Sequence, residues 1–209
     1  MICARALTEE GSCTAETCAT DRRKAAALSS AAAIGSYTGL LAEAIRAFKY
    51  PGHPGRGGFA EIFGRVIVGW LWEHADVADD LDLIVVNPTE PNRAVPHTEL
   101  LLSAIKRADP EGVFPVDDPE SPVLRKTRPT IRSHGRSRVG RREAAEAHCE
   151  ALEVDVNAIL YKRLLIVDDV LTTGSQLREV SRLLVRRGAE RVRGLVLART
   201  PDMWAASDG

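Results

Sequence analysis

The residues best suited to chemistry stand in one stretch of the C-terminal half, at the end of a predicted buried strand. Residues 164–167 are four aliphatic side chains in a row, which is typical of a strand buried on both faces of a sheet. Two adjacent carboxylates, Asp168 and Asp169, follow directly. Carboxylate oxygens accept hydrogen bonds, so such a pair suits the neighbouring hydroxyls of a sugar. We therefore predict a polar ligand site at the carboxyl end of this strand.

A turn rich in Thr, Gly and Ser separates the two acids from a helical pattern that opens at Leu177. Backbone N–H groups at such a turn, together with the dipole of the following helix, favour a bound phosphate, and hydroxyls add further donors. A phosphate cradle beside a carboxylate pair predicts a ribose 5-phosphate site, whereas the alternative is an ordinary turn after a buried strand. The predicted 5-phosphate-binding residues are Leu171, Thr172, Thr173, Gly174 and Ser175.

A second informative stretch, residues 125–142, carries eight basic residues and no acidic one. A mobile basic loop could close over a ligand with several negative charges, exclude water and stabilise a departing anion. The alternatives are a solvated basic loop and a patch that contacts nucleic acid phosphates. The nearby phosphate signature favours the first interpretation.

Composition limits the class of protein. A chain of 209 residues with 44% hydrophobic and 27% charged residues is expected to form one α/β domain with a full core. The net charge of −1 argues against whole-protein attraction to nucleic acid or to an anionic membrane. No stretch approaches the roughly 18 apolar residues of a membrane span, and the first residues do not resemble a secretory signal. We expect a cytoplasmic protein without a membrane partner.

Four cysteines do not form a recognisable metal motif. Cys3, Cys13 and Cys18 lack a close pair, and Cys149 is distant in the sequence. A structural zinc site usually needs four ligands, often with paired cysteines. Free thiols are the favoured interpretation, and we predict no metal-ligating residue.

The hydrophobic pattern predicts alternating strands and helices, and hence a parallel sheet with right-handed crossovers. We expect residues 1–30 to be poorly ordered, residues 31–200 to form the domain and residues 201–209 to form a tail. Structure is expected to begin around Tyr37 and to become irregular over residues 109–123. Helices are predicted near residues 41–48, 59–70, 101–105 and 177–188, and strands over residues 83–86, 164–167 and 192–197.

The sequence of two acids, two apolar residues and Thr-Thr-Gly-Ser resembles the phosphoribosyl pyrophosphate (PRPP) signature of type I phosphoribosyltransferases. Gln176 departs from it, because the family usually has Thr there. Phe48-Lys49-Tyr50, and the spacing of Leu124, Lys126, Thr130 and Arg141, are similar to competence protein F (ComF)-like phosphoribosyltransferases. The resemblance implies a type I phosphoribosyltransferase-like α/β fold, with a central parallel sheet flanked by helices and a small N-terminal helical or hood region.

The resemblance also implies the roles of individual residues. Asp168, Asp169 and Arg141 would be catalytic, and the turn from Leu171 to Ser175 would hold the 5-phosphate. The implied reaction transfers ribosyl 5-phosphate from PRPP to a nitrogen acceptor and releases pyrophosphate, with Mg²⁺ bound mainly through PRPP. The implied pyrophosphate-binding residues are Asn87, Pro88, Thr89, Arg93, Lys49 and Lys126.

Two other classes remain open at this point. The domain could bind PRPP or a nucleotide without catalysis, as a regulatory or competence-associated protein. It could instead contact single-stranded DNA through its basic segment, although few aromatic residues near that segment are suited to base stacking. The sequence leaves the acceptor and the oligomeric state open, a homodimer included.

Overall fold

The computed structural model describes residues 27–50, 52–130 and 138–201, and all structural statements below refer to these residues. No helix among them is long and apolar enough to cross a membrane.

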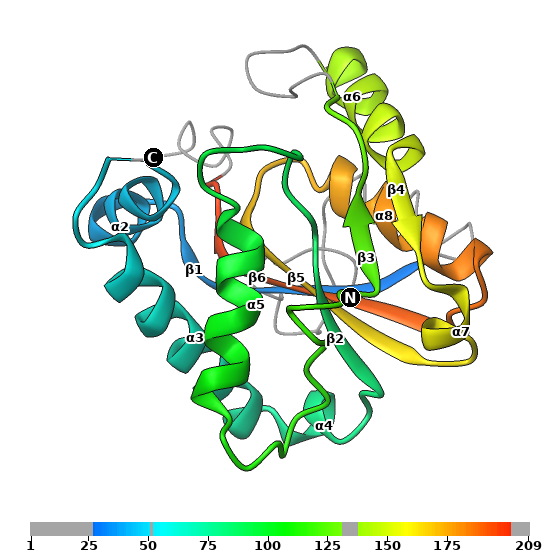
Figure 1. Ribbon diagram of the computed structural model, residues 1–209, viewed down its shortest axis with the longest axis horizontal. Coiled ribbons are helices and arrows are strands. Elements are labelled where there is room, and N and C mark those ends of the chain that lie inside the picture. The colour runs from blue at the N-terminus through cyan, green and yellow to red at the C-terminus, as the bar shows by residue number, and fades with distance from the viewer. Residues whose placement is uncertain (1–26, 51, 131–137, 202–209) are drawn as a thin grey trace, which may run out of the picture.

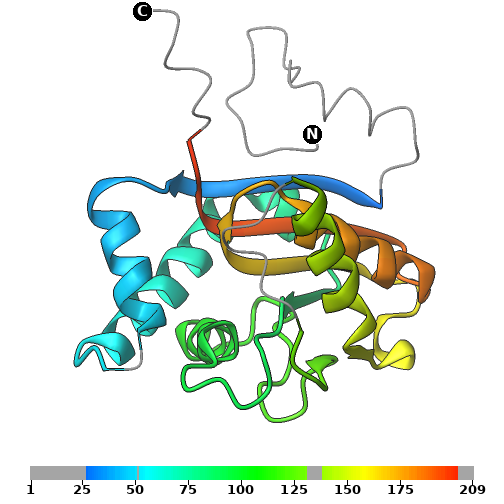
Figure 2. The same cartoon turned by 90° about the horizontal axis from the view of Figure 1, so that it is seen from above.

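A four-stranded parallel sheet forms the centre of the domain (Figure 1). Its strand order is β1-β6-β5-β2 (Figure 2), so β5, which carries the two acids, is an inner strand paired with β6 and β2. Parallel pairing places the carboxyl ends of all four strands at one edge, where α/β proteins bind ligands. The bounds are β1 Leu28–Ser36, β2 Leu83–Val86, β5 Arg163–Leu171 and β6 Arg191–Arg199.

Helices cover both faces of this sheet, as Figure 1 shows with the sheet seen nearly edge-on. One apolar core joins the sheet to α2 (Gly39–Lys49), α3 (Arg56–Glu73) and α5 (His97–Ala108). The core on the other face includes α7 (Val156–Ile159) and α8 (Ser175–Arg186), and α6 (Arg138–Glu150) packs against α8. A short helix, α4 (Ala75–Ala78), precedes β2. The predicted fold class, a parallel α/β sheet flanked by helices, is confirmed.

The structure contains elements that the sequence analysis missed. Strand β1 begins at Leu28, inside the segment that was expected to be poorly ordered, and its Ala-, Ser- and Gly-rich sequence has little β propensity. Small residues suit this part of the sheet because the helices approach closely. A Cβ atom at Gly194 on the neighbouring strand β6 would lie 2.5 Å from the side chain of Leu177 and 3.6 Å from that of Ala31.

The prediction of a mobile basic loop over residues 125–142 is wrong at both of its ends. Arg125 and Lys126 belong to β3 (Leu124–Lys126), which pairs antiparallel with β4 (Leu152–Val154) in a separate two-stranded sheet. From Arg138 onward the chain forms α6. Residues 131–137, the middle of the predicted loop, lie outside the described residues.

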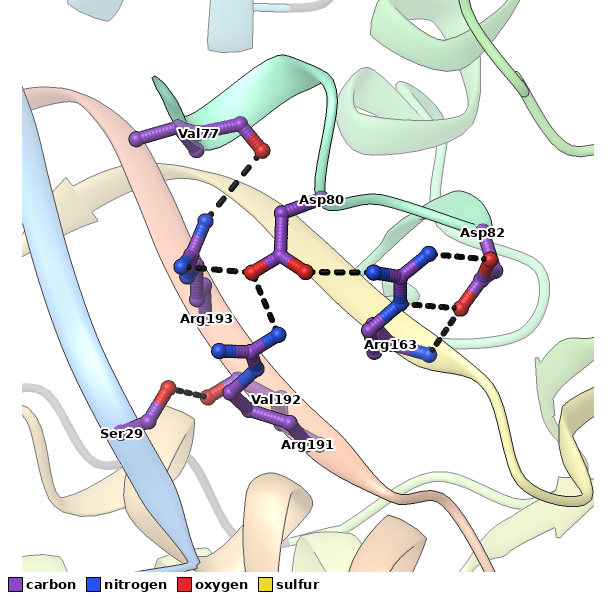
Figure 3. Close-up of polar contacts among 8 residues, drawn as sticks. All are labelled: Ser29, Val77, Asp80, Asp82, Arg163, Arg191, Val192 and Arg193. Atoms are coloured by element: carbon purple, nitrogen blue, oxygen red, sulfur yellow. Dashed lines mark hydrogen bonds and ion pairs between the residues drawn. The ribbon is translucent and has the colours of Figure 1, made fainter.

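A cluster of charges joins the strands at the opposite, amino edge of the sheet (Figure 3). Asp80 lies between three guanidinium groups, which belong to Arg163 at the start of β5 and to Arg191 and Arg193 on β6. Arg163 also donates to both carboxylate oxygens of Asp82 at 2.8 Å. Burial alone would raise the pKa of Asp80, but Arg163, Arg191 and Arg193 outweigh burial and hold that pKa below its ordinary value.

The Asp80 cluster predicts a stability effect with a defined pH dependence. Asp80→Asn should lower the melting temperature at pH 7, because it removes the carboxylate that Arg163, Arg191 and Arg193 share and leaves Asp82 to pair with Arg163. A lowered pKa in the folded state gives stability above the ordinary pKa, and this stability is lost as the pH falls through the folded value. The difference between parent and variant should therefore shrink below about pH 4 and in high salt.

Asp79→Asn is the matched control, since Asp79 is an exposed neighbouring acid. Thermal melts of the three proteins between pH 2.5 and pH 7 measure the effect. Equal melting temperatures for the two variants at pH 7 would contradict a stabilising role of Asp80.

Candidate functional site

The alternation of strand β5 sends the two adjacent acids to opposite faces of the sheet. Leu165 and Val167 pack into the core with α2, α3 and α5, whereas Leu164 and Ile166 pack into the core with α7 and α8. Side chains along a strand alternate between faces, so Asp169 continues the first series and Asp168 the second. The partners of each acid confirm this division.

Asp169 contacts two basic side chains on the face of α2 and α5. Its Oδ2 atom lies 2.6 Å from Lys49 Nζ, at the end of α2, and 2.6 Å from His97 Nε2, at the start of α5. The Asp169 and His97 side chains are only 8% and 6% exposed. The second ring nitrogen of His97, Nδ1, is buried and has no hydrogen-bond partner within the described residues.

Asp168 has neutral partners on the other face. Asn87, which directly follows β2, donates from Nδ2 to Asp168 Oδ2 at 2.7 Å. The backbone N–H of Asp169 donates to Asp168 Oδ1 at 2.8 Å. The Oδ1 atom of the same Asn87 amide lies 3.0 Å from Nε2 of His148 on α6. Asn87 was predicted to bind pyrophosphate, but in this structure both ends of its amide are engaged by other side chains.

The different surroundings separate the acidities of the two carboxyls. Burial and the neighbouring negative charge of Asp169 raise the pKa of Asp168 well above its ordinary value, and the hydrogen bond from Asn87 offsets only part of this. Burial would also raise the pKa of Asp169, but its contacts with His97 and Lys49 outweigh burial and lower that pKa. Asp169 is thus the more firmly ionised member of the pair, and Asp168 is the more basic acceptor.

The predicted phosphate turn lies directly after the acids and leads into α8. Leu171 ends β5, and Gly174 has a φ of 70°, a left-handed value that glycine adopts without strain. Helix α8 starts at Ser175, and the N–H groups of its first turn have no acceptor within the helix. The hydroxyls of Thr173 and Ser175 lie 3.0 Å apart, and Thr172 is exposed. These five residues form a compact loop with free donor capacity at a helix N-terminus, as an anion cradle requires.

Arg178 on α8 is a basic residue at this loop that the sequence analysis did not select. Its guanidinium donates to the backbone oxygen of Thr173 at 2.6 Å and to that of Gly174 at 3.3 Å. The helical spacing of four residues from Gly174 was the signal that could have identified it.

The side chain of Lys126, a predicted pyrophosphate-binding residue, is buried and contacts Glu90 and Thr130. Its Nζ atom lies 2.5 Å from Glu90 Oε1 and 2.6 Å from Thr130 Oγ1, and its side chain is 3% exposed. Glu90 also accepts a hydrogen bond from the backbone N–H of Thr130 at 3.0 Å. The sequence analysis missed Glu90, which neutralises Lys126 and connects the loop after β2 to β3.

Three of the remaining predicted site residues, Pro88, Thr89 and Arg93, lie in the loop after β2. Thr89 donates from its backbone N–H and its hydroxyl to the carboxylate of Glu99, each at 2.8 Å. Pro88 is buried next to Asn87, and Arg93 is exposed. Arg141 lies on α6, and its side chain is outside the described residues. The structure thus brings Asp168, Asp169, Asn87 and Lys49 together and leaves Arg93 without such a contact.

The acidic side chains of the site limit how a magnesium ion could be held. Within residues 27–50, 52–130 and 138–201, no group of three or more His, Cys, Asp or Glu side chains is placed to hold a metal. Asp169 is already paired with Lys49 and His97, which leaves Asp168 as the carboxylate with acceptor capacity. This donor set fits a Mg²⁺ ion that is held mainly by oxygens of its own ligand.

The C-terminal part of the chain is similar to a known protein family. Residues 137–209 match the family model described as phosphoribosyl transferase domain. This match includes β5 with both acids, the phosphate loop and α8. The resemblance to type I phosphoribosyltransferases that we predicted from the sequence is therefore confirmed, and it is carried by this part of the chain.

A named relative agrees with the more specific resemblance. The chain is 36% identical over 77 residues to competence protein F of Haemophilus influenzae (strain ATCC 51907 / DSM 11121 / KW20 / Rd). The alignment covers 37% of this chain and 33% of that protein, so the chain spans about a third of the length of this relative. The predicted similarity to competence protein F is confirmed over this segment.

Two solved structures show weak overall similarity. One is described as the allosteric regulatory enzyme of purine biosynthesis, with a TM-score of 0.44 and 16% identity. The other is glutamine PRPP amidotransferase from B. subtilis in complex with ADP and GMP, with a TM-score of 0.43 and 17% identity. Each similarity covers 73% of this chain and 30% of the other. TM-scores of this size support no conclusion on their own.

The Lys126–Glu90 pair predicts a structural role that stability measurements can test. Lys126→Met should lower the free energy of unfolding by about 2–3 kcal/mol, because it leaves a partly buried carboxylate without its partner. Lys126→Met combined with Glu90→Gln should recover much of this loss. Denaturant unfolding of both single variants, the double variant and the parent measures the coupling.

Arg125→Met serves as the control, since Arg125 is an exposed cation on the same strand. If Lys126→Met were no more destabilising than Arg125→Met, Lys126 would be available for a ligand instead.

Proposed function

We propose that this protein binds PRPP and transfers its ribosyl 5-phosphate group to a small nitrogen acceptor. The observation that carries the proposal is the order of functional groups along one inner strand and its turn. Asp168 and Asp169 end β5, and the cradle of residues 171–175 follows at the N-terminus of α8. The family match covers the same residues.

The proposed reaction exchanges one bond at the anomeric carbon. The bond from this carbon to the pyrophosphate oxygen breaks, a bond to the acceptor nitrogen forms, and pyrophosphate and one proton are released. Positive charge develops on the ribose ring in between, so catalysis comes from orientation and charge stabilisation. Asp168, with its raised pKa and its free acceptor capacity, is suited to hold the ribose hydroxyls, while Asp169 provides a fixed negative charge beside them.

The pyrophosphate side of the proposed site relies on Lys49 more than on Lys126. The Lys49 side chain is 29% exposed beside Asp169, whereas that of Lys126 is 3% exposed and neutralised by Glu90. Arg93, Pro88, Thr89 and Arg141 stay predictions for this role. A Mg²⁺ ion bound through PRPP would be held on the protein side by Asp168 and would neutralise charge on the departing pyrophosphate.

A second candidate is a PRPP- or nucleotide-binding protein without catalysis, in a regulatory or competence-associated role. Two observations favour it. Glu90 places an acidic group next to the predicted pyrophosphate residues, and the named relative is a competence protein. Release of pyrophosphate in the presence of Mg-PRPP and a panel of nucleobases separates the two candidates. The acceptor, a homodimer and a cytoplasmic location stay predictions.

Replacing Asp168 tests the ribose assignment directly. Asp168→Asn should weaken the binding of Mg-PRPP by at least tenfold, because a charge-assisted hydrogen bond contributes roughly 1.5–3 kcal/mol. Isothermal titration measures the affinity, and circular dichroism confirms that the variant is folded. Asp79→Asn, which removes the same charge at the other edge of the sheet, should bind like the parent. An Asp168→Asn variant with unchanged affinity would remove Asp168 from the proposed site.

A further inference from the structure

Four polar side chains form a continuous series between the phosphate loop and Asp168. Gln176, in the first turn of α8, has its Nε2 atom 3.3 Å from His148 Nε2 on α6. His148 Nε2 lies 3.0 Å from Asn87 Oδ1, and Asn87 Nδ2 donates to Asp168 Oδ2 at 2.7 Å. These residues come from α8, α6, the end of β2 and β5, which are distant from one another in the sequence.

The protons in this series can be assigned from Asp168 outward. An ionised carboxylate only accepts hydrogen bonds, so the Asn87 amide must direct its NH₂ group toward Asp168. Its oxygen then faces His148, and the imidazole must carry its proton on Nε2 in order to donate. Gln176 approaches the same ring nitrogen, so with that tautomer its amide must be turned to place its oxygen there, and the amide oxygens of Asn87 and Gln176 then share one N–H donor.

Burial makes this arrangement specific. His148 and Asn87 are 5% and 3% exposed, so neither can easily replace its partner with water. Burial, together with the nearby positive charge of Lys126, lowers the pKa of His148 to about 4, although Glu90 acts in the opposite direction. The imidazole is therefore neutral at physiological pH and carries one ring proton, which the contact with the Asn87 oxygen places on Nε2.

We propose that His148 is a positioning residue. His148 fixes the amide of Asn87, and this amide orients Asp168. Gln176, in the first turn of α8, keeps His148 in place. The inference rests on the proposed function for its ligand, since Asp168 is the proposed ribose acceptor. It assigns a role to Gln176, which departs from the family signature. The Gln176 amide contacts His148, so the side chain at this position connects α8 to α6. It is therefore more than a hydrogen-bond donor to the 5-phosphate.

The first test reads the imidazole proton and needs no ligand. Long-range ¹H–¹⁵N spectra of the ¹⁵N-labelled full chain at pH 8 distinguish the two neutral tautomers, and His148→Gln identifies the His148 signals. We expect the Nε2–H tautomer in the parent and a mixture of tautomers in Asn87→Ala. An Nδ1–H tautomer in the parent, or a tautomer that Asn87→Ala does not change, would overturn the proposal.

The second test measures ligand affinity with two substitutions at one position. His148→Leu removes the donor and should weaken Mg-PRPP binding about tenfold, as expected for one hydrogen bond that acts on a charged group. His148→Gln keeps an N–H donor near the place of Nε2 and should stay within about twofold of the parent. Inorganic phosphate in the proposed cradle of residues 171–175 would not reach Asp168, so its affinity should be the same in all three proteins.

The two tests fail in distinguishable ways. Equal PRPP affinities for the parent and His148→Leu, or equal losses in His148→Leu and His148→Gln, would overturn the positioning role. If His148→Leu does not fold, the affinity of Asn87→Ala takes its place, with the same tenfold loss expected. A parent protein that does not bind PRPP would refute the proposed function, and the tautomer measurement would then decide the positioning role alone.

Discussion

The site depends on one electrostatic constraint, the burial of two adjacent carboxylates at the end of an inner strand. Two like charges this close to each other and to the core are costly, and the raised pKa of Asp168 reflects that cost. Because β-strand side chains alternate, the two acids face different layers of the protein. Each layer stabilises one carboxylate in its own way. Lys49 and His97 pair with Asp169, and the neutral amide of Asn87 donates a hydrogen bond to Asp168.

This division has a consequence for stability. An acid whose pKa is raised by folding favours the protonated form in the native state, so ionisation of Asp168 costs stability as the pH rises above its ordinary pKa. Asp169 has a lowered pKa and acts in the opposite direction. Asp80, at the other edge of the sheet, differs from Asp168. Three arginines surround Asp80, so its negative charge is balanced by ion pairs. An ionised Asp168 therefore has an unmet demand for donors, which ribose hydroxyls would satisfy.

The sequence predicted the strand, turn and helix around Asp168 because their patterns are local and continuous. The surrounding residues could not be predicted in this way. His97 and His148 are single polar residues at the start of α5 and near the end of α6, and their role follows only from the contacts that bring them beside the acids. Strand β1 was missed because its small residues are selected by close packing, not by strand propensity. The resemblance implied a pyrophosphate-binding role for Lys126, which stays a prediction, but it gave no sign that Glu90 pairs with this side chain.

The loop after β2 is the element through which the separate parts of the site are connected. Glu90 contacts Lys126 on β3 and Thr130 after it, and Asn87 contacts His148 on α6. Both of these partners belong to the segment between residues 124 and 150, which includes the basic residues of the predicted closing loop. The same Asn87 side chain also contacts Asp168. His148 on α6 is therefore two hydrogen bonds away from Asp168, whereas β3 contacts the same loop at Glu90, three residues after Asn87.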